Sequence, residues 1–348
     1  MAHVSAASLV CPRCDHAVDA AVGALCPVDG AALVTPDAKA RHGDDPVLGR
    51  VIAGRFPVVD LIGRGGFGAV YHAVQLPVGR EVAIKVLARQ HADNDDLRAR
   101  FFREARTVAS LSHPSTVTLF DYGQEDDGLL FMALELIRGP TLRDVVKAEA
   151  PLPPQRALRL TAQILGALAE AHDHGLVHRD LKPGNVMLTA ARGGERVKVL
   201  DFGMTKVLFG NDEADMTRSD MVLGTPKYLS PEQARNRDVG PHSDVYAMGV
   251  VLFEMLSGAP PYVAPSTFEL LTLHATAEIP PLPEALDLPP AIEAVVRKAM
   301  AKDVAARYPH AAAMLVDVRA LLPGADAGDG IGTGDHAVVT GPPSGVSA

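Results

Sequence analysis

The stretch His178-Arg179-Asp180-Leu181-Lys182-Pro183-Gly184-Asn185, followed by Val199-Leu200-Asp201-Phe202-Gly203, decides how this chain is interpreted. Between short apolar runs it carries two carboxylates, an amide, a lysine and an arginine. A loop does not need this much polar chemistry to stay soluble, and charges held among apolar residues are costly unless they have partners. The stretch therefore predicts a site that holds a charged ligand.

Length and composition indicate a globular protein with more than one core. The chain has 348 residues, of which 47% are hydrophobic and 22% are charged, whereas one core usually serves about 100–200 residues. The formal net charge is −9, and Lys and Arg never run beyond adjacent pairs. Nucleic acid is therefore not expected as a partner, because binding to a phosphate backbone needs clustered positive charge.

Neither a membrane anchor nor a secretory signal is expected. The longest apolar stretch, residues 245–256, is interrupted by Glu254 and is shorter than the roughly 20 residues that span a bilayer. The first ten residues lack a basic start and an apolar core of about 7–15 residues. These observations predict a cytoplasmic protein.

All three cysteines lie near the N-terminus, and their spacing suits a metal better than a disulfide framework. Cys11 and Cys26 each precede a proline that favours a tight turn, and Cys14 follows within the first turn. Zinc prefers four ligands in a tetrahedral arrangement, and either His16 or Asp29 could supply the fourth. The alternative is a degenerate segment that folds weakly without a metal.

Residues 1–35 resemble the small zinc ribbons found beside many bacterial regulatory domains. Asp29 stands where the last cysteine of such a ribbon would be. Residues 36–50, which include Gly43, Asp44 and Pro46, predict a polar linker.

A glycine-rich turn between two short strands is a second indication of a bound anion. Residues 58–62 and 69–74 are strand-like, and the turn carries Gly63, Gly65 and Gly68. Glycines at the tip of a hairpin allow backbone N–H groups to approach an anionic ligand closely. Taken alone, the same pattern would fit an ordinary turn.

The strand predicted over residues 82–86 places Lys85 between apolar neighbours, where its ammonium group needs an anionic partner. A helix is predicted next, with Phe101 and Val108 on one face. Glu104 falls on the same face. We therefore expect Glu104 to point inward and to pair with Lys85, the alternative being a solvated glutamate at the edge of that face.

Together these motifs resemble the eukaryotic-type, or Hanks-type, serine/threonine protein kinases of bacteria. The resemblance covers residues 51–322. The matching elements occur in the family's order, and they are the glycine-rich turn, Val82-Ala83-Ile84-Lys85, Glu104, His178-Arg179-Asp180 with Asn185, Asp201-Phe202-Gly203, and Ser230-Pro231-Glu232.

The resemblance implies an α+β protein kinase fold with two lobes. Residues 51–134 would form a small N-lobe rich in strands, residues 135–139 a hinge, and residues 140–322 a larger helical C-lobe. Residues 323–348 are rich in Gly, Pro, Ser and Asp and are expected to form a disordered tail.

The resemblance also implies a reaction, namely transfer of a phosphoryl group from ATP to protein substrates with the help of Mg²⁺. Asp180 would accept or orient the proton of the attacking hydroxyl, and Lys182 would offset charge on the transferred group. Asn185 and Asp201 would hold Mg²⁺ through oxygen ligands. In this family a lysine at the place of Lys182 goes with specificity for serine and threonine.

Binding of ATP is assigned by the same resemblance. Gly63, Gly65 and Gly68 would cover the phosphates, and Lys85, oriented by Glu104, would bind the α- and β-phosphates.

The adenine would lie between Val70 and Ala83 on one side and Met187 on the other. It would bond to the backbone of Glu135 and Ile137.

Two further interpretations concern regulation and activity. By the same resemblance, Arg179 implies control by phosphorylation of the activation loop, with Thr217 and Ser219 as candidate sites, or else these two are solvated hydroxyls. The alternative to an active enzyme is a pseudokinase scaffold that binds nucleotide without catalysis. Such proteins usually lack the lysine, the base or the metal-binding aspartate, and here Lys85, Asp180 and Asp201 are all present.

Overall fold

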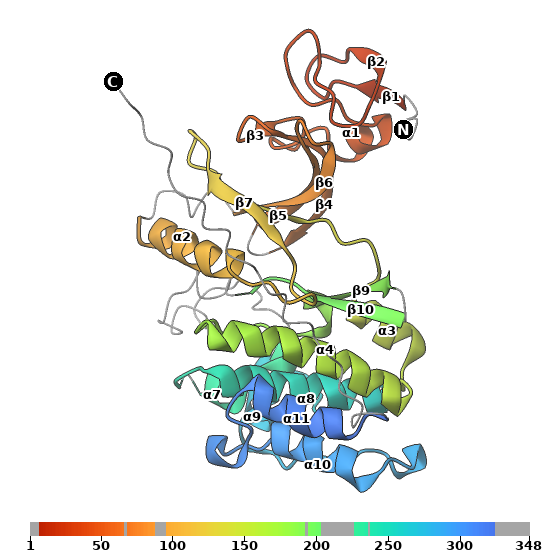
Figure 1. The fold of residues 1–348 in the computed structure, drawn as a ribbon, viewed down its shortest axis with the longest axis vertical. Helices are drawn as coiled ribbons and strands as arrows, with labels where there is room; N and C mark the ends of the chain where they lie inside the picture. The colour runs from red at the N-terminus through yellow and green to blue at the C-terminus, as the bar shows by residue number, and fades with distance from the viewer. Residues whose placement is uncertain are drawn as a thin grey trace, which may run out of the picture.

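The computed structural model of the chain describes residues 7–65, 68–87, 95–191, 194–202, 226–235 and 237–323. A small N-terminal unit lies on top of a β-sheet, and a mainly helical lobe lies below the sheet (Figure 1). Each of the two lower parts has a hydrophobic core of its own. The predicted α+β fold with two lobes is therefore confirmed.

The N-lobe is built on a six-stranded antiparallel sheet with the order β3-β4-β5-β6-β8-β7. Its strands are β3 (Val51–Ile52), β4 (Phe56–Gly65), β5 (Gly68–Gln75), β6 (Arg80–Leu87), β7 (Leu119–Gln124) and β8 (Leu130–Glu135). Helix α2 (Asp95–Ala109) lies beside this sheet (Figure 1). The strands predicted from alternating apolar residues are thus present, because alternate side chains such as Tyr71 and Ile84 fill the core.

The C-lobe is helical and is organised around α8 (Pro241–Ser257), which is buried along nearly its whole length. The surrounding helices are α3 (Leu142–Glu149), α4 (Pro154–Asp173), α7 (Pro231–Ala234), α9 (Thr267–Thr276), α10 (Pro290–Ala299) and α11 (Ala311–Ala320). Helix α8 ends at Gly258, whose φ of 81° is the left-handed conformation that glycine adopts at helix ends. Within the described ranges, no helix has both the length and the apolar character needed to cross a membrane.

The N-terminal unit consists of a two-stranded hairpin, β1 (Ala7–Val10) with β2 (Ala17–Ala20), and two cysteine-bearing turns. Its core is small and includes Leu9, Leu33 and two of the cysteines, Cys11 and Cys26. So small a core favours an additional source of stability, such as a metal.

Residues 36–50 differ from the polar linker that the sequence predicted. They begin with helix α1 (Pro36–His42), which starts at a Thr35 cap and a proline in its first turn. Val47 and Leu48 are buried, and Val47 belongs to the core of the N-lobe. The segment therefore packs against the N-lobe, and its Gly, Asp and Pro residues form turns of a folded structure.

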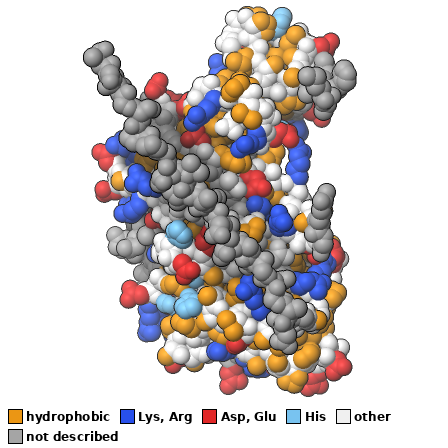
Figure 2. Space-filling model, viewed as in Figure 1, with side chains coloured by type: hydrophobic (Ala, Val, Ile, Leu, Met, Phe, Trp, Pro, Cys, Tyr) orange, Lys and Arg blue, Asp and Glu red, His pale blue; other side chains and the backbone are white. Residues whose placement is uncertain are grey.

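The described side chains on the face shown in Figure 2 mix positive and negative charges, with no extended patch of one sign. This pattern fits the negative net charge of the chain, and it gives no support for a nucleic-acid surface on this face.

A buried ion pair joins α7 to the chain near α11. The Arg307 guanidinium binds Glu232 at 2.8 and 3.2 Å, and Glu232 also accepts a hydrogen bond of 2.7 Å from Ser243. Both charged side chains are at most 5% exposed. This ion pair therefore fixes α7 to the segment that precedes α11.

We predict that Arg307→Ala destabilises the protein by about 3–5 kcal/mol, because it leaves a buried carboxylate without its counter-ion. The measurement is denaturant unfolding of the full chain. Arg297→Ala is the matched control, since it breaks a partly exposed pair with Glu293 on helix α10 and should cost no more than about 0.5 kcal/mol. Equal losses for the two variants would contradict the prediction.

Candidate active site and cysteine cluster

The loop that follows α4 is held by the buried carboxylate of Asp244 on α8. Asp244 accepts hydrogen bonds from the backbone N–H groups of His178 at 2.8 Å and Arg179 at 2.9 Å, and it lies 2.9 Å from Nε2 of His172. Burial alone would raise the pKa of Asp244. The hydrogen bonds and the nearby histidines together lower the pKa by more than burial raises it, so the net shift is downward. Asp244 therefore anchors the backbone of the loop that carries His178 and Arg179.

His178 connects this loop to the aspartate that follows β10 (Gly194–Val199). It is fully buried, its Nε2 lies 2.8 Å from the carbonyl oxygen of Leu200, and its ring is 5.0 Å from that of Phe202. Arg179 and Asp201 have φ angles of 67° and 61°. Such left-handed conformations in residues other than glycine are unfavourable and tend to occur at functional sites.

Three side chains of the loop form one hydrogen-bonded cluster. Lys182 Nζ donates to Asp180 Oδ2 at 2.7 Å, and Asn185 Nδ2 donates to Oδ2 and to the carbonyl oxygen of Asp180 at 3.1 and 2.9 Å. Asn185 lies in a short 3₁₀ helix (Pro183–Asn185) that leads into β9 (Val186–Ala191). Because the amide nitrogen of Asn185 donates its hydrogen bonds to Asp180, the amide oxygen of Asn185 is available as a metal ligand.

The lysine of β6 reaches across the two lobes. Lys85 Nζ binds Asp201 Oδ1 at 2.6 Å, and the two side chains are 8% and 37% exposed. Desolvation acts to raise the pKa of Asp201, but the ion pair with Lys85 and the nearby His178 and Lys182 together lower it, and the net shift is downward. Lys85 and Asp201, which were both predicted as site residues, are therefore in contact, although the sequence did not predict that they pair directly.

The predicted ion pair of Lys85 with Glu104 is not what the described residues show. Glu104 is only 4% exposed on helix α2, so it does point inward, and its carboxylate lies 3.9 Å from Nε of Arg103. The ammonium of Lys85 instead binds Asp201. The physical reason is that an ammonium group pairs with the carboxylate that lies within direct hydrogen-bond reach, and here that carboxylate belongs to Asp201.

The glycine-rich turn joins β4 to β5, as predicted. A Cβ atom on Gly63 or Gly65 would meet no atom of the described residues within 4 Å, whereas one on Gly68 would lie 1.9 Å from the carbonyl oxygen of Val86. Gly68 is thus required for the close approach of two strands. Gly63 and Gly65 leave open space over the backbone, which suits an anionic ligand.

The residues expected around the adenine come from both lobes. Val70 and Ala83 lie on the neighbouring strands β5 and β6, and Met187 lies on β9. Glu135 ends β8, and Ile137 follows it in the hinge. Their common contact with one ligand stays a prediction.

Lys198 is a residue that the sequence analysis missed. Its Nζ binds Glu135 Oε2 at 2.7 Å, and the same oxygen accepts hydrogen bonds of 3.3 Å from Thr118. These contacts fix the hinge against β10 of the other lobe. No motif marks Lys198, so only the three-dimensional structure identifies it.

Several predicted residues lie outside the described ranges. These are the candidate phosphorylation sites Thr217 and Ser219, the glycine Gly203, and nearly all of the 323–348 tail. Arg179, in the loop anchored by Asp244, has a buried Nε atom that finds no hydrogen-bond partner among the described residues.

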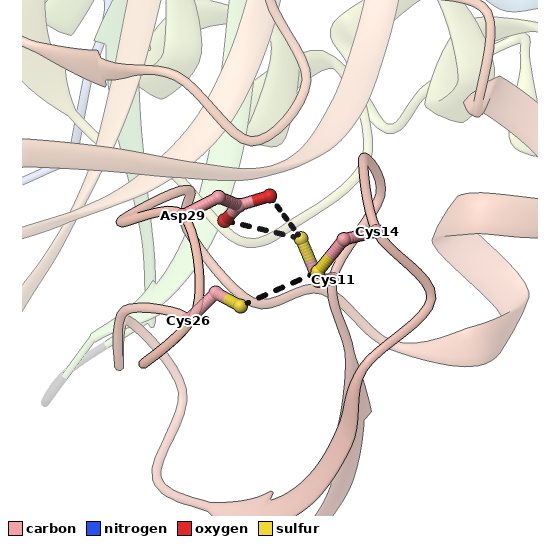
Figure 3. Close-up of side chains that lie close together, drawn as sticks. All are labelled: Cys11, Cys14, Cys26 and Asp29. Atoms are coloured by element: carbon pink, nitrogen blue, oxygen red, sulfur yellow. Dashed lines mark hydrogen bonds between the residues drawn. The ribbon is translucent and has the colours of Figure 1, made fainter.

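The three cysteines and Asp29 converge on one point of the N-terminal unit (Figure 3). Their candidate ligand atoms all lie within 4.8 Å of one another. Cys14 Sγ is 3.7 Å from Cys26 Sγ, and Cys11 Sγ is 3.3 and 3.5 Å from the oxygens of Asp29. Of the two alternatives for the fourth ligand, the structure brings Asp29 into the cluster.

Two of these separations are close to the edges of a zinc tetrahedron. With bond lengths of about 2.3 Å to sulfur and about 2.0–2.2 Å to oxygen, the S–S and S–O edges are about 3.8 and 3.6 Å. Backbone N–H groups of Arg13 and Val28 point at Cys11 and Cys26, each at 3.4 Å from the sulfur. The four residues are therefore of the number and kind that zinc uses, and the Cys14–Cys26 and Cys11–Asp29 separations are close to those of a zinc site.

Residues 56–316 match the family model described as the protein kinase domain. The chain belongs to the protein kinase family. It is 39% identical over 283 residues to the serine/threonine-protein kinase pkn3 of Myxococcus xanthus, a match that covers 80% of this chain and 52% of the relative. It is 38% identical to the serine/threonine-protein kinase PrkC of Bacillus subtilis, with 78% of this chain and 41% of the relative covered.

A solved structure supports the kinase fold. The kinase domain of PknI from Mycobacterium tuberculosis superposes with a TM-score of 0.60 at 28% identity, covering 78% of this chain and 98% of that domain. The chain spans about half or less of the length of the curated relatives it matches.

We predict that Asp244→Ala lowers both stability and activity, because two backbone N–H groups of the catalytic loop lose their buried acceptor. The expected loss is about 2–4 kcal/mol in unfolding free energy and at least about tenfold in kcat. Urea unfolding and phosphoryl transfer from labelled ATP are the measurements.

Asp173→Asn is the control for this variant, because Asp173 is exposed at the end of α4. It should leave both quantities within error of the wild type. A stable Asp244→Ala protein with full activity would show that the carboxylate does not position the loop.

Proposed function

We propose that this chain is an ATP-dependent serine/threonine protein kinase, which transfers the γ-phosphoryl group of ATP to a hydroxyl of a protein substrate. The observation that carries the proposal is the cluster of Asp180, Lys182 and Asn185, together with the pair of Lys85 and Asp201. Phosphoryl transfer depends on positioning and charge neutralisation, and these five side chains supply both.

Asp180 is the group that acts on the attacking hydroxyl. Its carboxylate is held by two donors on one oxygen, so the other oxygen can accept or orient the hydroxyl proton. Lys182 lies 2.7 Å from this carboxylate. Its ammonium is also placed to offset charge on the transferred phosphoryl group.

Lys85, Asn185 and Asp201 bind the phosphate end of ATP. When Mg²⁺ is bound, it neutralises phosphate charge, and the oxygens of Asn185 and Asp201 are the hard ligands that would hold it. The Lys85 ammonium is within reach of the same place because it already contacts Asp201. Gly63, Gly65 and the hinge residues complete the nucleotide site in this proposal.

Protein hydroxyls are the proposed substrates, and the cytoplasm, which contains ATP, is the proposed compartment. Support comes from curated relatives that are named serine/threonine-protein kinases. A lysine at position 182 agrees with serine and threonine as acceptors, since the family uses this residue for that specificity.

Phosphorylation of Thr217 or Ser219 is the proposed means of activation. The buried, unpartnered Nε of Arg179 among the described residues supports this, because a guanidinium suits a phosphate.

We further propose that Cys11, Cys14, Cys26 and Asp29 bind one Zn²⁺ ion as a structural site. The ligand set is closed, with no position left for a substrate, and the surrounding core is small. In this proposal zinc stabilises the N-terminal unit and takes no part in phosphoryl transfer.

The kinase proposal predicts that Asp180→Asn lowers phosphoryl transfer by about 10²–10⁴-fold, because the variant loses the group that accepts the proton. Transfer of labelled phosphate from ATP with Mg²⁺ to the protein itself and to a generic protein substrate is the measurement. Asp126→Asn changes an exposed aspartate outside the site and serves as the control. Wild-type protein that binds ATP but transfers no phosphate would favour the pseudokinase scaffold.

The zinc proposal predicts about one zinc ion per full-length chain, measured by elemental analysis after purification without chelators. Cys14→Ser and Asp29→Ala should lower the bound zinc, whereas Asp29→Cys should hold it at least as tightly because thiolate is a better zinc ligand. His16→Ala, which changes the alternative ligand, should retain the metal. Absence of zinc from the wild-type protein would refute the site.

A further inference from the structure

One carboxylate, Asp45, joins the 36–50 segment to the glycine-rich hairpin. Its side chain is only 1% exposed. Asp45 accepts hydrogen bonds from the Tyr71 hydroxyl at 3.0 and 3.1 Å and from the backbone N–H of Val47 at 2.8 Å. It also forms an ion pair with the guanidinium of Arg64, which lies between the two glycines Gly63 and Gly65.

The two side chains of this ion pair differ in how firmly the protein holds them. Asp45 is fixed, because a buried phenol and a backbone N–H hold it, and Tyr71 is only 2% exposed. Burial and the adjacent Asp45 raise the pKa of Tyr71, so its hydroxyl remains a donor. Arg64 is 58% exposed and lies on the hairpin that approaches the nucleotide. The pair therefore ties the hairpin to a fixed point.

The N-terminal unit holds that fixed point in place. Lys39 of α1 donates to the carbonyl oxygen of Cys11 at 3.1 Å and pairs with Asp15. The backbone N–H of Ala32 donates to the carbonyl oxygen of Gly49. The backbone N–H of Gly49 in turn donates to the carbonyl oxygen of Val58 on β4. One polar cleft of about 660 Å³ is thus lined by residues of the N-terminal unit, of helix α1 and of the glycine-rich hairpin.

We infer that Asp45, acting through Arg64, is a positioning residue for ATP, and that the N-terminal unit is thereby an internal support of the phosphate-binding hairpin. This inference rests on the proposed function, because it assumes that ATP binds under the hairpin. A hairpin rich in glycine loses conformational entropy when it closes on a ligand. An ion pair that restrains the hairpin before ATP binds lowers this entropic cost, and it therefore strengthens ATP binding.

The test compares ATP affinity in variants of the full chain. Arg64→Ala should weaken binding of a non-hydrolysable ATP analogue with Mg²⁺ by about three- to tenfold, with a matching rise in the KM for ATP and little change in kcat. Arg64→Lys should restore part of the affinity, since it keeps the charge but not the forked geometry.

Arg41→Ala is the matched control. Arg41 lines the same cleft and joins α1 to β4 through an ion pair with Asp60 at 3.0 Å, but it does not touch the glycines. It should leave ATP affinity unchanged. A merely structural role for Asp45 would shift the melting temperature of Arg64→Ala while leaving its ATP affinity and KM at wild-type values, and that result would overturn the inference.

A double-mutant cycle gives an independent criterion. Asp45→Asn should weaken ATP binding in the wild-type background and have little further effect when Arg64 is already alanine. Equal effects in both backgrounds would overturn the inference, because Asp45 would then act by another route. Failure of the proposed function is a different result, since wild-type protein would then neither bind nor use ATP.

Discussion

The catalytic loop depends on the buried carboxylate of Asp244. It accepts hydrogen bonds from two backbone N–H groups of the loop and lies beside His172. Helix α4, the loop and helix α8 therefore meet at one anion. With those groups satisfied, the loop can hold Arg179 in a left-handed conformation that would otherwise be unfavourable. The positions of Asp180, Lys182 and Asn185 follow from this anchoring, as they are carried by the same loop.

The second constraint acts between the lobes. Lys85 of the sheet binds Asp201 of the helical lobe, and Lys198 binds Glu135 at the hinge. A change in lobe orientation alters the first contact most directly, because Lys85 and Asp201 come from opposite lobes. The site is therefore sensitive to the whole arrangement of the molecule, although each of its residues lies in a short motif.

Much of the fold and many residues of the candidate site could be predicted, because the motifs are local in sequence and each residue type has a strong chemical reason. The contact of Lys85 with Asp201 could not, since it depends on distances between lobes. Nor could the burial of Asp45, which looked like part of a polar linker because its partners Tyr71 and Arg64 lie further along the chain.

The attachment of the N-terminal unit to the sheet has a thermodynamic consequence. If the Asp45–Arg64 contact couples the N-terminal unit to ATP binding at the glycine-rich hairpin, reciprocity requires that the coupling free energy act in both directions. ATP would then strengthen the packing of the N-terminal unit by the same factor by which that unit strengthens ATP binding. A macromolecule that docks on the N-terminal unit and prefers one of its conformations would sense whether nucleotide is bound without touching the nucleotide site.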